Sequence, residues 1–101
     1  MPGFNTEVKH QLGKEEATRR LKGFLEQVRQ RYKDQVSELE GTWNDNILNF
    51  LLKTYGFNIT GILTVEDDVV RLNGQLPFAA MAFRGKIEQS ISSELERELK
   101  A

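Results

Sequence analysis

Hydrophobic and polar residues alternate along several short stretches of this chain, whereas two longer stretches repeat with a helical period. A period of two is typical of a half-buried strand, and a period near 3.6 is typical of an amphipathic helix. The first alternating stretch covers residues 4–11, where Phe4, Thr6, Val8 and His10 are separated by more polar residues. This pattern predicts a short amphipathic strand near the start of the chain.

The next stretch predicts one long amphipathic helix over residues 14–34. Gly13 can serve as its N-cap, and Glu15 and Glu16 lie in the first turn, where the helix dipole favours negative charge. The apolar side chains then fall on one helical stripe. They are Ala17, Leu21, Phe24, Leu25, Val28 and Tyr32.

The middle of the chain returns to a period of two and predicts an antiparallel meander of four strands. The predicted strands cover residues 36–43, 47–55, 57–66 and 69–76. Gly61 and Gly74 fall on inward faces of their strands, where a missing side chain permits a bend in the sheet or the close approach of a helix. We therefore expect a curved sheet.

A second long helix is predicted over residues 78–100. Pro77 suits the first turn of a helix. Apolar residues recur every four positions toward the end of the chain, and Glu94 is among the polar positions between them. The repeating apolar residues are Phe83, Ile87, Ile91, Leu95 and Leu99.

The order strand, helix, four-stranded meander, helix predicts a single α+β domain over residues 1–101. Its two long helices are expected to cover one face of a curved antiparallel sheet. This arrangement has the outline of a reduced helix-grip fold.

Composition and charge narrow the class of protein. The chain has 101 residues, of which 39% are hydrophobic and 29% charged, as in an ordered globular domain. Its net charge of -1 provides no overall field for nucleic acid or an anionic membrane. It has no cysteine, and no signal peptide or membrane span is visible. These features predict a soluble, cytoplasmic protein without disulfides.

Catalytic and metal-binding patterns are not found in the sequence, so we predict no catalytic residues, no metal and no cofactor, and a protein that is not an enzyme. His10 is the only histidine and has no nucleophile or carboxylate beside it. Glu38 and Glu40 share one face of a strand, as the two residues of a catalytic carboxylate pair do, but alternation on a solvated face gives the same pattern. No glycine-rich phosphate loop occurs.

The apolar run Leu76–Phe83 is too long to be buried on one side of a helix, because consecutive residues lie about 100° apart around the axis. Packing beneath the neighbouring chain, a contact between two copies, or an apolar surface could each account for it. We select Phe78, Met81 and Phe83 as the candidate contact residues.

Four stretches in order along the chain resemble the polyhydroxyalkanoic acid system proteins, a family of small bacterial proteins encoded with polyester storage-granule genes. The stretches are "VKHQLGKEEATRRL", "LEGTWNDNILNF", "ITGILTVEDDVVRLNGQLP" and "FRGKIEQSISSELERELK". None of them is a catalytic signature. The resemblance implies a role in granule association or regulation, and it defines no functional residues.

Three functional hypotheses follow. The first is a non-enzymatic structural or interaction protein at polyester granules, whose partner is the granule surface or a granule protein and which can also form a homodimer. The alternative is a helix-grip binder of a small apolar ligand, held between the last helix and the sheet. The third is RNA binding through basic residues of the first helix, and it predicts affinity that falls steeply with salt.

Overall fold

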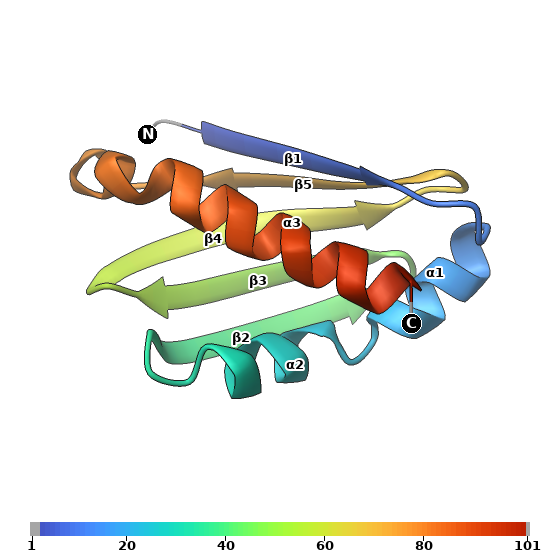
Figure 1. Ribbon diagram of the computed structural model, residues 1–101, viewed down its shortest axis with the longest axis horizontal. Coiled ribbons are helices and arrows are strands. Elements are labelled where there is room, and N and C mark those ends of the chain that lie inside the picture. The colour runs from blue at the N-terminus through green and yellow to red at the C-terminus, as the bar shows by residue number, and fades with distance from the viewer. Residues whose placement is uncertain (1–2, 101) are drawn as a thin grey trace.

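A computed structural model describes residues 3–100 and shows one antiparallel sheet with helices on one face (Figure 1). The predicted domain also includes residues 1, 2 and 101, which lie outside the described residues. The strands are β1 (Gly3–Lys9), β2 (Val36–Asn44), β3 (Ile47–Thr54), β4 (Phe57–Val65) and β5 (Val69–Gln75). The helices are α1 (Lys14–Leu21), α2 (Phe24–Arg31), the 3-10 helix η1 (Phe78–Phe83) and α3 (Arg84–Lys100).

The sheet has the order β1-β5-β4-β3-β2, and every neighbouring pair is antiparallel. The meander prediction is therefore correct, and its strand ends differ from the observed ones by one residue at most. The first strand joins the meander beside β5, so β1 and β2 form the two edges. The α+β, helix-grip-like fold class is confirmed.

The predicted helix over residues 14–34 is wrong in its continuity. The chain leaves the α-helix at Lys22 and Gly23, re-enters it at Phe24, and ends at Arg31. Glycine inside a helix costs about 1 kcal/mol relative to alanine, so Gly23 is a weak point at which a helix can break. The apolar stripe continues across the break because Leu21 and Phe24 both enter the core.

The predicted helix over residues 78–100 also needs correction, because its first six residues form the 3-10 helix η1. Residues three apart lie above one another in a 3-10 helix. Ala80 and Phe83 therefore face the protein, where Ala80 is buried, whereas Phe78 and Met81 lie on another line. The α-helix begins only at Arg84 and buries its repeating apolar residues from Ile87 onward.

Glycines and aromatic rings form one row across the inner face of the sheet. In this row Phe50 pairs with Gly61, Gly61 with Gly74, and Gly74 with Phe4. A Cβ atom on Gly61 would lie 2.5 Å from the Phe50 ring, and one on Gly74 would overlap the Phe4 ring. The space left by the two glycines is thus filled by aromatic rings, and not by the helix that the sequence also allowed.

Candidate functional site: an apolar end surface

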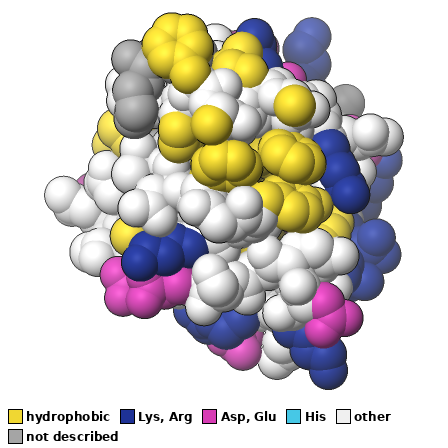
Figure 2. Space-filling view, turned by 90° about the vertical axis from the view of Figure 1, so that its left-hand side faces the viewer, with side chains coloured by type: hydrophobic (Ala, Val, Ile, Leu, Met, Phe, Trp, Pro, Cys, Tyr) yellow, Lys and Arg dark blue, Asp and Glu magenta, His cyan; other side chains and the backbone are white. Residues whose placement is uncertain are grey.

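The predicted contact residues lie at one end of the molecule's longest dimension. Phe78 projects from η1 with 80% of its surface exposed, which is the highest value among the described large hydrophobic residues. Met81 and Phe83 are half-buried against the core. Figure 2 views this end and shows hydrophobic side chains gathered on it, with Lys, Arg, Asp and Glu side chains toward its margins.

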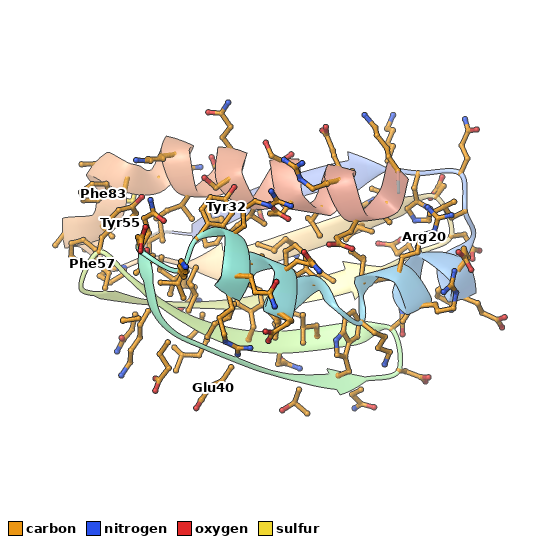
Figure 3. All side chains as sticks on the ribbon, turned by 60° about the horizontal axis from the view of Figure 1, so that its bottom comes forward. Arg20, Tyr32, Glu40, Tyr55, Phe57 and Phe83 are labelled. Atoms are coloured by element: carbon orange, nitrogen blue, oxygen red, sulfur yellow. The ribbon has the colours of Figure 1, made fainter. Side chains whose placement is uncertain are left out.

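Two aromatic residues from the β3–β4 hairpin join this surface. The Phe83 ring stacks on Tyr55, with 4.9 Å between ring centroids and 11° between ring planes. Its centroid lies 6.0 Å from that of Phe57, at an interplanar angle of 46°. Figure 3 shows the three rings together. We call Tyr55, Phe57, Phe78, Met81 and Phe83 the apolar end surface.

Sequence patterns do not reveal the contribution of Tyr55 and Phe57 to this surface. Tyr55 ends one predicted strand and Phe57 begins the next, and neither position reveals a partner 26 or more residues away. A signal was present nonetheless. An aromatic residue is unusual before glycine in a tight hairpin turn, where asparagine or aspartate is preferred.

Tyr55 has a left-handed backbone conformation, with a φ of 54°, and Gly56 follows with a φ of 80°. Such consecutive positive φ values are typical of the type I′ turn that connects two twisted strands. They are strained for a residue with a large side chain. The hairpin therefore holds the Tyr55 ring on the end surface at some cost in backbone energy.

A small apolar cleft opens beside the end surface, between α2 and α3. It offers about 50 Å³ of space, compared with roughly 300 Å³ or more for a pocket that binds a drug-sized ligand. Tyr55 and Lys86 also line it, and the Lys86 ammonium lies 5.6 Å from the centre of the Tyr55 ring. We call it the α2–α3 cleft, and its apolar lining consists of Val28, Tyr32, Val36, Leu52, Ile87 and Ile91.

Between the sheet and the helices, apolar side chains of the described residues fill the interior. Leu72 is fully buried and Phe50 nearly so, while Trp43 and Phe57 pack against the same core. These four side chains occupy the space between the sheet and the helices. The packing therefore disfavours the alternative function, an enclosed site for a small apolar ligand.

The basic side chains of the first two helices are largely engaged within the chain. Arg19 and Arg20 both contact the Glu16 carboxylate, at 2.5 and 2.9 Å. Hydrogen bonds from these two guanidinium groups lower the pKa of Glu16 from 4.5 to about 2. Arg29 pairs with Glu26 and also donates to the carbonyl oxygen of Leu39.

Lys22 is a further basic residue, in the link between α1 and α2, and its ammonium lies 4.7 Å from the centre of the Trp43 ring. Trp43 is thus covered by a cation of its own chain and is half-buried. A phosphate backbone would have to compete with these internal partners. The arrangement gives little support to RNA binding through α1 and α2.

Glu94 is a charged residue on the buried face of α3, and its side chain is fully buried. Its carboxylate forms an ion pair with Arg31 of α2, whose side chain remains 42% exposed. Arg97 lies farther away, with 3.7 Å between Nε and the Glu94 oxygen Oε1. Neither Glu94 oxygen has a hydrogen bond of good geometry within the described residues. The pair joins α2 to α3 near the α2–α3 cleft.

His10 has a structural role in the fold. Its Nε2 lies 2.9 Å from the carbonyl oxygen of Glu66, and the Leu12 backbone N–H donates to its Nδ1 over 3.2 Å. Since Nδ1 accepts, the ring proton is on Nε2 and is donated to Glu66. His10 therefore fixes the chain after β1 against the β4–β5 turn, and both of its nitrogens are used.

The remaining sequence candidates are dispersed. Glu38 and Glu40 are exposed on β2, and Glu38 pairs with Lys53 at 3.3 Å. Among residues 3–100, no group of three or more His, Cys, Asp or Glu side chains is placed to hold a metal ion. In the same residues, no helix is both long and apolar enough to cross a membrane.

Comparisons with known proteins agree with this architecture. Residues 5–99 match the model of a family described as "Putative polyhydroxyalkanoic acid system protein". None of the curated protein sequences matches the chain.

Two solved structures are similar to this chain in fold. A protein from Thermus thermophilus, TTHA0849, is 16% identical, with a TM-score of 0.61 over 97% of each chain. A protein from Nitrosospira multiformis is 10% identical, with a TM-score of 0.60 over 97% of this chain and 96% of that one. At these identities the likeness shows the fold alone.

Proposed function

Because the chain belongs to the polyhydroxyalkanoic acid system protein family, we propose that it is a non-enzymatic interaction protein that binds polyhydroxyalkanoate granules in the cytoplasm. The proposed contact is the apolar end surface. The observation that carries the proposal is the exposure of Phe78, which is 80% exposed beside a cluster of aromatic rings. Contiguous apolar surface of this kind commonly marks an interaction site.

Covering the exposed surface of Phe78 alone would contribute enough free energy to affect granule binding measurably. A phenylalanine buries about 150–250 Å² when it is fully covered. Covering the exposed four-fifths of Phe78 would therefore remove roughly 120–200 Å² from water, which is worth about 3–5 kcal/mol at 25 cal/mol per Å². Since every 1.4 kcal/mol is tenfold in affinity, even half of this gain would shift partition more than tenfold.

A pelleting assay with amorphous polyhydroxybutyrate granules tests the proposal. We expect Phe78→Ser to reduce the granule-bound fraction at least tenfold, because it removes the most exposed ring. Ile62→Ser is the matched control, since Ile62 is 46% exposed on the opposite, helix-free face of the sheet. Equal pelleting of both variants and the wild type would contradict the assignment of this surface, and absence of wild-type binding would contradict the function.

The homodimer remains the competing use of the same surface. Sedimentation velocity on the wild type and on Phe78→Ser separates the two. A dimer that is lost in Phe78→Ser, together with wild-type protein that stays off granules, would assign the apolar end surface to self-association.

A further inference from the structure

The α2–α3 cleft opens onto the apolar end surface, and the two share Tyr55. We propose that this cleft binds a single aliphatic ester chain by inserting one of its short pendant alkyl groups. The inference rests on the proposed function and deepens it, since it names the class of ligand: linear polyesters of 3-hydroxy acids with short side chains.

The size of the cleft selects short groups. About 10–15 Å³ of such space holds one water-sized group. A methyl group is larger than a water molecule, so the 50 Å³ available holds at most about three to five groups of methyl size. A methyl, ethyl or propyl group fits, whereas a heptyl or longer chain does not. A whole drug-sized molecule is excluded for the same reason, but one pendant group of a longer chain is not.

The chemistry of the cleft matches an ester whose alkyl group points inward. The inner wall is made of aliphatic and aromatic side chains from α2, β2, β3 and α3. Lys86 stands at the mouth and is exposed. Among the described residues Lys86 makes no ion pair, so its ammonium can donate hydrogen bonds to an ester carbonyl or to a terminal carboxylate.

The strained backbone of Tyr55 is a second observation in favour of a binding site at the cleft, because the hairpin turn itself does not require an aromatic residue at this position. Asparagine would occupy the same turn position more easily. Backbone strain of this kind persists where the surrounding structure enforces it, and it clusters at functional sites. Here the strain puts a ring at the mouth of the cleft, stacked on Phe83 and facing the Lys86 ammonium.

Soluble oligomers test the inference separately from granule binding. We would titrate oligomers of 3-hydroxybutyrate and of 3-hydroxydecanoate, whose side chain is a heptyl group, into the protein and follow amide chemical shifts. The butyrate oligomer is expected to shift residues around the cleft and to bind at least tenfold more tightly than the decanoate oligomer. Ile62→Ser, on the opposite face of the sheet, should leave this affinity unchanged.

Two substitutions probe the cleft directly. Ser90→Leu fills it and should reduce oligomer affinity at least tenfold, whereas Ser93→Leu, on an exposed part of α3, should not. Tyr55→Asn should weaken binding with little change in unfolding midpoint, because relief of turn strain offsets the lost stacking. Tyr55→Phe retains the ring and should retain binding.

The outcomes separate the two proposals. If neither oligomer binds, or if Ser90→Leu binds as well as the wild type, the cleft is not an ester site, even where granule pelleting is normal. If the oligomer binds through the cleft but granules do not pellet the protein, the cleft assignment stands and granule association fails.

Discussion

The ion pair between Arg31, which is 42% exposed, and Glu94, which is fully buried, predicts that its two single substitutions differ in their effect on stability. Arg31→Met and Glu94→Gln each break this ion pair, but the first leaves a carboxylate without its partner and the second leaves a guanidinium without its partner. Arg31→Met leaves a carboxylate that is fully buried, with only Arg97 at 3.7 Å as a remaining cation. Glu94→Gln leaves a guanidinium that is already 42% exposed and can turn to water. Arg31→Met should therefore be the more damaging change.

The magnitudes follow from the cost of a stranded buried charge. Removing one partner of a buried ion pair typically costs about 3–5 kcal/mol. For Arg31→Met we expect about 3 kcal/mol, the lower end of this range, because Arg97 still partly compensates the charge of Glu94. Glu94→Gln should cost about 1–2 kcal/mol, the penalty of a poorly satisfied buried amide. The double variant Arg31→Met with Glu94→Leu should lie within about 1 kcal/mol of the wild type, because apolar replacement of a buried pair is often neutral.

Urea unfolding and thermal melting, both followed by circular dichroism, measure these differences. For a domain of this size, about 3 kcal/mol corresponds to a fall of roughly 12–24 °C in Tm. Arg97→Met is the control and should change the free energy of unfolding by less than about 1 kcal/mol, since Arg97 is 57% exposed and solvent weakens its 3.7 Å ion pair with Glu94. The reasoning would be refuted if Glu94→Gln destabilised the protein as much as Arg31→Met.

Two further predictions concern the sheet and the first helix. Gly74→Ala should destabilise the protein by about 1–3 kcal/mol, because its Cβ would overlap the Phe4 ring and lie 2.9 Å from the Thr60 carbonyl oxygen. Gly85→Ala, with open space around its Cβ, should be neutral or stabilising, and Phe4→Leu should partly rescue Gly74→Ala in a double-mutant cycle. Because the pKa of Glu16 is lowered from 4.5 to about 2, its stabilising effect is present above pH 4.5 and is lost as the pH falls toward 2. Glu16→Gln should therefore lose less stability than the wild type between about pH 5 and pH 2.5 in urea unfolding, and an equal loss would contradict the assignment.

The strands could be predicted almost residue by residue because alternation is a local signal that burial enforces. The helix break at Gly23 could not, since Leu21 and Phe24 keep the apolar stripe in phase across it. The 3-10 geometry of η1 was missed for a similar reason. An uninterrupted apolar run does not reveal which of its residues turn inward.

The site was only partly predictable. The sequence indicated that some apolar residues near Phe78 cannot all be buried on one side of a helix, and Phe78 is indeed exposed, although its use as a contact residue stays a prediction. Tyr55 and Glu94 could not, because their roles depend on partners distant in sequence. Glu94 lies three residues after Ile91 and seven after Ile87, which is the buried side of α3, and Arg31 of α2 provides its counter-charge there.

The position of the apolar end surface has a consequence for how densely the protein could coat a granule. The molecule measures 37 × 25 × 22 Å, and Figure 1 shows η1 and the β3–β4 turn together at one end of the long axis. Adsorption through that end would stand each molecule upright, with a footprint near 25 × 22 Å rather than 37 × 25 Å. An upright layer would hold more copies per unit area and present the α1 end to the surroundings.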